Sequence, residues 1–282
     1  MPNRTKERRR ERLSSHILAT LQQEKKSYRS GREAETGALI ASYNVHKCVG
    51  MDQRFDPTRV EAVIGEIGAD IIALQEADQR FGSREGLLDL QRLERENGLV
   101  PVKVKGHPKC HGWHGNVLLF REGSVSHVHQ IDLPGVEPRG ALVVDVDLKA
   151  GSLRVVAAHL GLLRRSRLRQ AEAIVSAVAA RGERPTLLLG DLNEWRVGPR
   201  SSLENLHPEF GPLTAHLPSF PSRFPLFALD RILGSPHDLI TGIEVHDTPL
   251  ARVASDHLPI KAHIDLKHLT ATAPSSKGKV AA

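Results

Sequence analysis

The stretch PTLLLGDLNE, residues 185–194, joins a run of apolar residues directly to an acid and an amide. Such a run, closed by glycine, predicts a short buried β-strand. Asp191 and Asn193 are two residues apart, so in an extended chain they lie on one face. A charge at the end of a buried strand costs desolvation energy unless another group compensates it. The stretch therefore predicts a strand that brings polar groups to a functional site.

Five further segments place polar side chains beside apolar runs in the same way: LIASYNVH (39–46), DIIALQE (70–76), LRVVAAHL (153–160), FALDRIL (227–233) and VASDHLPI (253–260). Their polar members include Asn44, Glu76, His159, Asp230, Asp256 and His257. Six separate partners, each offsetting the desolvation cost of one polar side chain, are hard to explain. Convergence of these side chains on one hydrated cation would explain all six together.

The types of side chain limit the choice of cation. Carboxylates and amides are hard oxygen donors, which suit Mg²⁺, with Mn²⁺ as a possible substitute. Glu76 and Asp256 could hold the ion together with substrate phosphate, helped by Asn44. A zinc site would need several Cys and His at short spacings, and the nearest candidate, HPKCHGWH at 107–114, fits no zinc pattern.

Two histidines complete a predicted site for phosphoryl cleavage. Phosphate ester hydrolysis needs an activated water, stabilisation of developing charge and help for the leaving oxygen. His159 and His257 could serve these needs, and Asp230 is a candidate to orient His257. Asp191 and Asn193 could address one attacking water or phosphate oxygen. A single Asp or Asn after a strand is more often a turn or cap residue, but the paired groups of GDLN and SDHLP favour catalysis.

The pattern of apolar segments predicts the fold class. Strands are expected over 38–45, 70–75, 115–120, 141–147, 153–159, 186–191, 228–233 and 258–264, and helices over 58–67 and 165–180. A single doubly wound sheet would need a helix after nearly every strand. So many strands with few helices indicate two sheets packed face to face, with helices outside.

Charge divides the chain into three predicted parts. Residues 1–36 hold ten Lys/Arg and five Glu, a net +5, and residues 267–282 hold three Lys and no acid, a net +3. Because the whole chain carries +6, the body, residues 37–266, carries −2. We expect a basic, flexible arm, one folded domain and a disordered tail. Basic charge outside the domain weakens the case for a nucleic-acid groove without excluding it.

The arm has an amphipathic pattern, in which Leu13, Ile17, Leu18 and Leu21 fall on one helical face behind a run of arginines. It could contact an acidic membrane surface or nucleic acid, although a solvated extension is the more common use of such a terminus. No apolar run is long enough to span a membrane, and no export signal is evident. Cys48 and Cys110 are expected as free thiols, which favours the cytoplasm.

Seven strings in order resemble the endonuclease/exonuclease/phosphatase superfamily, over about residues 39–264. The strings are SYNVH (42–46), IIALQE (71–76), GNVLLF (115–120), AAHLGL (157–162), LLGDLNE (188–194), ALDRI (228–232) and SDHLPI (255–260). The resemblance implies a deoxyribonuclease I-like fold: a four-layer α/β sandwich of two packed mixed β-sheets flanked by helices, with the site at one end of the sheets. The resemblance implies that the body, residues 37–266, is a catalytic domain. The chain is similar to small bacterial members of the group.

The resemblance also implies roles for individual residues. Glu76 looks like the main metal-ligating glutamate, with Asn44 beside it and Asp256 near the metal. Asp230 looks like the aspartate that orients His257. Asp191 and Asn193 look like the pair that orients or activates the nucleophile. His159 looks like the histidine that stabilises the phosphate or protonates the leaving group. His257 looks like the histidine proposed as general base or transition-state stabiliser. The family leaves the base open between Asp191 and His257. Arg223, in a loop of undefined role, could contact a phosphate.

These observations predict a Mg²⁺-dependent phosphoric ester hydrolase, a phosphodiesterase rather than a monoesterase. Nucleic acid is the substrate that the superfamily and the basic tails favour. A phospholipid or its head group, cleaved at a membrane surface, is the alternative, and an inactive binding module on the same fold is a third possibility. A nuclease would need a groove lined with Lys and Arg, whereas a lipid enzyme would need exposed apolar loops near the site.

Overall fold

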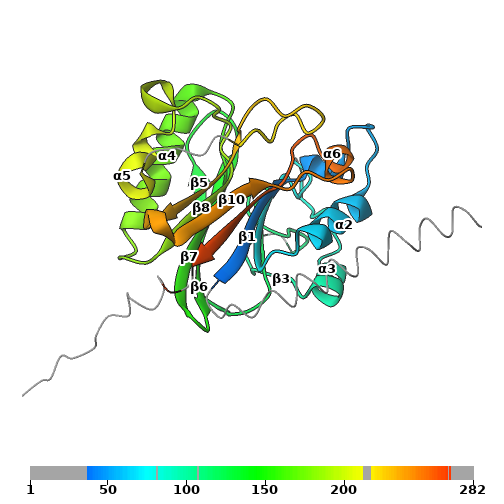
Figure 1. Cartoon of the computed structure of the whole chain (residues 1–282), viewed down its shortest axis with the longest axis horizontal. Helices are drawn as coiled ribbons and strands as arrows, with labels where there is room; N and C mark the ends of the chain where they lie inside the picture. Colours follow the sequence, from blue (N-terminus) through cyan, green and yellow to red (C-terminus); the bar gives the residue numbers. More distant parts are fainter. Residues whose placement is uncertain (1–36, 81, 107, 212–216, 266, 268–282) are drawn as a thin grey trace, which may run out of the picture. The chain divides into compact units, whose positions relative to one another are not determined.

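A computed structural model describes residues 37–80, 82–106, 108–211, 217–265 and 267 (Figure 1). The predicted basic arm, 1–36, and all of the predicted tail except Lys267 lie outside the described residues, so the three-part division stays a prediction. No helix within the described ranges has both the length and the apolar character needed to cross a membrane.

Two mixed sheets form the body of the protein, as predicted. In spatial order, the first contains β10 (Ile240–Val245), β11 (Ile260–Asp265), β1 (Gly37–Asn44), β2 (Ile71–Gln75), β4 (Val117–Phe120) and β3 (Val100–Pro101). The second contains β5 (Ser124–Leu133), β6 (Arg139–Leu148), β7 (Gly151–His159), β8 (Thr186–Asp191) and β9 (Asp230–Ser235). β1 and β2 are parallel, as are β7 and β8, whereas β2 with β4, β6 with β7 and β8 with β9 are antiparallel.

Helices cover the outer face of each sheet, which gives four layers (Figure 1). α2 (Pro57–Ile67) and α3 (Leu90–Asn97) pack on the first sheet, and α4 (Arg164–Ala179) and α5 (His207–Phe210) on the second. Alternate residues of one strand serve two cores: Val155 faces the other sheet, whereas Val156 faces α4. Strands buried on both faces are apolar without a break, which is why their sequences made them easy to predict.

Local signals place the ends of the predicted helices. Asp56 caps α2 by accepting a hydrogen bond from the backbone of Arg59, and the helix ends at Gly68, whose φ of 66° favours glycine. All eight predicted strands and both helices are found, with ends shifted by up to two residues. The strands not predicted are β3, β5 and β10, of which β5 is an edge strand with mostly exposed, polar residues and no apolar run.

A buried ion pair ties the second sheet to its covering helix. Arg154, on β7, is fully buried and donates two hydrogen bonds to Asp145 on β6, at 2.8 and 3.2 Å. Its remaining donors reach the carbonyls of Arg181 and Gly182, just past the end of α4, both at 3.0 Å. The guanidinium thus also satisfies carbonyl groups near a helix end, which otherwise lack partners.

We expect Arg154→Met to destabilise the fold by about 3–5 kcal/mol, because it leaves the buried Asp145 carboxylate without its two hydrogen bonds and with only Arg184, at 3.7 Å, as a cationic partner. Urea unfolding followed by circular dichroism measures this difference. The control is Lys149→Met, which removes an exposed ion pair with Glu122 and should change stability by no more than about 1 kcal/mol. Equal effects of the two substitutions would show that the buried pair carries no special weight.

Candidate active site

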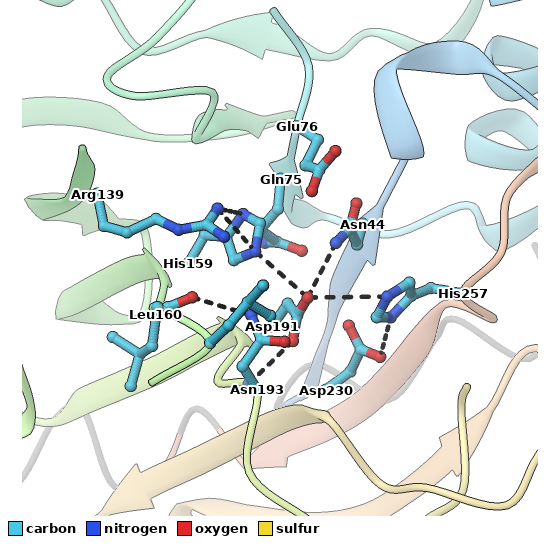
Figure 2. Close-up of polar contacts among 12 residues, drawn as sticks. Asn44, Gln75, Glu76, Arg139, His159, Leu160, Asp191, Asn193, Asp230 and His257 are labelled. Atoms are coloured by element: carbon cyan, nitrogen blue, oxygen red, sulfur yellow. Dashed lines mark hydrogen bonds and ion pairs between the residues drawn. The ribbon is translucent and has the colours of Figure 1, made fainter. Parts of the chain in front are cut away.

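The predicted site residues gather where strands of both sheets end on one side. In the parallel pairs, Asn44 is opposite Gln75 and His159 is opposite Asp191. β9 runs the other way, so its first residue, Asp230, is also opposite Asp191. The loop before β11 returns to this end, where the Ser255 hydroxyl donates to the Asn44 carbonyl at 2.7 Å. Figure 2 shows the side chains from these ends pointing toward one another.

Asp191 lies at the centre of the group. Its Oδ2 accepts a hydrogen bond from Asn44 Nδ2 at 2.9 Å and lies 3.4 Å from His159 Nε2 and 3.7 Å from His257 Nε2 (Figure 2). Its Oδ1 accepts from the backbone N–H of Asn193 at 3.0 Å. The residue is 2% exposed, so its charge depends on these partners rather than on water.

His257 is held between two carboxylates. Its Nδ1 bonds Asp230 Oδ2 at 2.8 Å, and its Nε2 faces Asp191 (Figure 2). Asp230 also accepts from the Ser219 hydroxyl, and the ring of Phe220 lies 4.8 Å from the His257 ring. The predicted pairing of Asp230 with His257 is therefore present in the structure, and it fixes the orientation of the imidazole.

The charges of these groups follow from burial and pairing. Burial lowers the pKa of His257, but Asp230 and Asp191 outweigh it and raise that pKa to about 10. Burial raises the pKa of Asp191 to about 6, against the opposing effect of His257. Burial and the neighbouring Arg139 guanidinium hold the pKa of His159 well below its ordinary value. At neutral pH, His257 is a cation, His159 is neutral and Asp191 is an anion poised near protonation.

Asn193 adopts a left-handed conformation, with φ of 52°. Its side chain donates to the carbonyl of Leu160, at the end of β7, at 2.9 Å (Figure 2). The next residue, Glu194, is fully buried and accepts hydrogen bonds from Ser202 and from the guanidinium of Arg167. The segment after β8 is therefore fixed by polar contacts on both sides.

Glu76 and Asp256 lie at the more open side of the group, with side chains 19% and 26% exposed. Glu76 has φ of 54° and forms an ion pair with Lys47. Burial raises the pKa of Glu76, but the hydrogen bond from Lys47 and the charges of Lys47 and His46 leave it below its usual value. His46, Lys47 and Cys48 all have positive φ, a left-handed turn that carries Lys47 to this carboxylate.

Two sets of residues could hold a divalent ion. The ligand atoms of Asp191, Asp230 and His257 lie within 4.8 Å of one another. However, both nitrogens of His257 already face carboxylates, and a protonated imidazole cannot be a ligand. Glu76 and Asp256 fit better, because each is partly exposed and already has a cationic side chain or a histidine ring beside it: Lys47 for Glu76, and His46, at 3.7 Å, for Asp256.

The third predicted ligand, Asn44, uses both ends of its amide within the protein. Its Oδ1 accepts from the His46 backbone at 3.0 Å while its Nδ2 donates to Asp191. The oxygen keeps one lone pair for an ion. These two contacts fit Asn44 to position Asp191.

Arg223 is exposed, and its carbonyl accepts a hydrogen bond from Arg252. The structure does not join it to the buried group. In the segment 107–114, Cys110 donates to the Ser83 carbonyl and His114 bonds Asp132, so these two side chains face different partners. His107 is outside the described residues. Among the residues with described positions, this segment yields no metal-binding cluster.

Sequence reasoning missed Arg139 and Lys47. Arg139, at the start of β6, places Nη1 2.9 and 3.0 Å from the two ring nitrogens of His159 and pairs with Glu137 at 2.8 Å (Figure 2). Arg139 is 9% exposed and directly precedes a buried apolar run. This is the same signal as that of the predicted residues, read at the beginning of a strand rather than at its end.

The sequence model of the Endonuclease/Exonuclease/phosphatase family matches residues 41–257, most of the chain and all of the buried group. This chain belongs to that family. Endonucleases, exonucleases and phosphatases, the activities in the family's description, all hydrolyse phosphate esters. No curated protein sequence matches the chain.

Solved structures share the family fold. A family member from Bacteroides vulgatus is 18% identical, with a TM-score of 0.63 over 82% of this chain and 99% of its own. A mannosyl-6-phosphatase from Bacteroides thetaiotaomicron is 16% identical, with a TM-score of 0.59 over 80% and 98%. TDP2 from D. rerio, complexed with a single-strand DNA product, is 15% identical, with a TM-score of 0.58 over 80% and 98%. At these identities, the likeness establishes the fold and not the substrate.

We expect the two buried histidines to hold opposite charge states at neutral pH in metal-free protein, with His257 protonated and His159 neutral. Nitrogen-15 chemical shifts of the imidazole rings measure this directly. Asp230→Asn should lower the pKa of His257, because it removes one of the two carboxylates that favour the cation. The interpretation fails if His257 is neutral in the unaltered protein, or if Asp230→Asn leaves its titration unchanged.

Proposed function

We propose that this protein is a Mg²⁺-dependent hydrolase that cleaves phosphate esters, a phosphodiesterase rather than a monoesterase. The supporting observation is the arrangement around Asp191, in which an anion with a raised pKa lies between a neutral and a protonated histidine. Acid–base catalysis works best when the pKa of the base is near the working pH. The complete set of buried, mutually oriented groups argues against an inactive binding module.

The charge states favour a division of roles that the sequence left open. Asp191, with a pKa raised to about 6, suits the general base that takes a proton from an attacking water. His257, kept cationic by Asp230, suits stabilisation of the negative charge that develops on the phosphoryl oxygens. His159, with Arg139 against its ring, faces the same carboxylate and would address the leaving oxygen or a phosphate oxygen.

Glu76 and Asp256, with Asn44 beside them, would hold the metal ion. When bound, Mg²⁺ supplies Lewis acidity that neutralises charge on the phosphoryl group. Lys47 would have to leave the Glu76 carboxylate, because the ammonium and a divalent ion would compete for it. Asn193 would bind a phosphate oxygen or the attacking water from its fixed position after β8. Arg223 stays a candidate for a phosphate contact further out.

We expect Asp191→Asn and His257→Asn to lower turnover of bis-p-nitrophenyl phosphate with Mg²⁺ by about 10² to 10⁴. Each substitution removes a charge from the buried group while keeping a side chain that can hydrogen-bond. The control is His127→Asn, at an exposed position on β5. Thermal melts establish that each variant is folded. A folded Asp191 or His257 variant with near-normal turnover would remove that residue from its proposed role.

Glu76→Gln is expected to abolish Mg²⁺ binding measured by isothermal titration calorimetry, because the amide keeps the shape of the side chain but loses the charge. Asp52→Asn is a matched control, since Asp52 lies on the loop after β1 but pairs with Arg59. The proposed metal site is wrong if Glu76→Gln binds Mg²⁺ as the unaltered protein does, or if Asp191→Asn alone abolishes binding.

Two substrate classes remain from the sequence, nucleic acid and phospholipid. Four basic side chains beside the buried group are paired with acids: Lys47 with Glu76, Arg84 with Asp78, and both Arg80 and Arg139 with Glu137. Such pairing lowers their value for a nucleic-acid backbone. A cytoplasmic location suits the two free thiols, Cys48 and Cys110. Large apolar side chains are exposed on the loops at this end of the molecule, and they favour phospholipid over nucleic acid.

A further inference from the structure

Exposed apolar side chains concentrate at the catalytic end of the molecule. Twelve large apolar side chains are exposed among the described residues, and only Val100 and Val128 lie on strands away from this end. The other ten lie within segments that follow or precede strands at the catalytic end: 45–56, 134–138, 160–163, 192–197, 217–229 and 251–254. Single exposed apolar residues need no explanation, but their concentration at one end does.

Six of these ten residues lie on the loops that adjoin the buried group. We call Leu162, Leu163, Trp195, Phe224, Leu226 and Phe227 the apolar rim; their exposed fractions run from 39% to 71%. Three contacts connect the rim to the site. Trp195 is two residues after Asn193, its ring lies 5.7 Å from that of Phe227, and Phe220 of the same loop packs against the ring of His257.

The loops that carry the apolar rim are also basic. Segments 160–165, 195–200 and 217–229 contain five arginines and no acid, although the body as a whole carries −2. The arginines are Arg164, Arg165, Arg196, Arg200 and Arg223. Arg196 contacts the buried Glu194 at 3.5 Å, and Arg164, Arg165, Arg200 and Arg223 are exposed. Apolar side chains interleaved with arginine complement an anionic lipid surface.

We propose that the apolar rim docks this protein on anionic membranes and that its substrate is a phospholipid whose head-group phosphate enters the site in the docked state. The proposal rests on the phosphoester hydrolase function proposed above. Insertion of the rim side chains among acyl chains would place the ends of β7 and β8, with His159 and Asp191, toward the head groups. The arginines would lie at the level of the lipid phosphates.

The composition of the rim favours lipid over nucleic acid. Bases stack on flat aromatic or guanidinium faces, but half of the rim residues are leucines, which offer hydrocarbon and no such face. The Arg196 guanidinium lies 4.7 Å from the centre of the Trp195 ring and so covers one of its faces. Exposed Leu, Phe and Trp next to Arg is the composition of segments that lie in a membrane interface.

The test measures binding of the full chain to vesicles of phosphatidylcholine, with and without phosphatidylglycerol, by co-sedimentation. We expect binding that increases with phosphatidylglycerol. Phe224→Ser with Leu226→Ser should weaken it by about tenfold or more for each side chain removed from the lipid. The matched control is Val100→Thr with Val128→Thr, which alters the two exposed apolar residues away from the catalytic end and should bind as the unaltered protein does.

Tryptophan fluorescence locates the contact, so that binding by any other part of the chain cannot be mistaken for it. The chain has two tryptophans, and only Trp195 belongs to the rim. Anionic vesicles should shift the emission to the blue, lipids brominated on their acyl chains should quench it, and Trp195→Phe should remove both effects. No vesicle effect on the unaltered chain, or an effect that persists in Trp195→Phe, would overturn the proposal.

Two further measurements separate the proposal from its rivals and from the hydrolase function. If single-stranded DNA binds in place of vesicles and loses affinity in the Phe224/Leu226 variant, the rim is a nucleic-acid surface. If sedimentation shows a dimer that this variant dissociates, and vesicles do not bind, the rim is a contact between copies. Hydrolysis of bis-p-nitrophenyl phosphate without vesicle binding would leave the hydrolase function intact and overturn docking. Vesicle binding without hydrolysis would support docking and overturn the hydrolase function.

Discussion

A hydrogen bond between two strand ends joins the two sheets at the site. Asn44, at the end of β1, donates to Asp191, at the end of β8, and the two residues belong to different sheets and are 147 positions apart. Both side chains are buried. A buried carboxylate is tolerated only where donors or cations surround it, and those around Asp191 come from both sheets: His159 from the second, His257 from the loop that leads into the first. The sheets must therefore pack so that their strand ends align to within hydrogen-bonding distance.

The surrounding framework restrains this alignment with further buried charges. Arg154 ties the second sheet to the end of α4, and Arg167 ties the start of α4 to Glu194, three residues after Asp191. Removal of one partner from such a pair leaves an uncompensated charge, which makes partial displacement of the loops costly. The scaffold can thus hold the groups in fixed positions without support from a bound ligand, which is the condition for electrostatic preorganisation.

The sequence allowed the fold to be predicted well and the site in part. Strand ends such as Asp191 and Glu76 stand out because a polar group after an apolar run is costly, and that cost acts locally. The partners of these groups are not local. Nothing near residue 47 indicates that its ammonium reaches Glu76, since this depends on a left-handed turn and on the parallel pairing of β1 with β2. Likewise, β5 carries no apolar run because most of its side chains are exposed, and its place in the sheet follows from pairing with β6.

Burial changes in steps across the catalytic end, and each step suits a different task. The Asp191 and Asp230 side chains are 3% and 1% exposed, so their interactions with His257 act in a medium of low dielectric constant, where they shift pKa values strongly. Glu76 and Asp256, at 19% and 26%, retain the access to water that a hydrated cation needs as it enters and leaves. The apolar rim is more exposed still, at 39% to 71%. A phosphate ester that passed from the exposed rim to the buried group would therefore lose water progressively and reach the proton-transferring groups only where water is largely excluded.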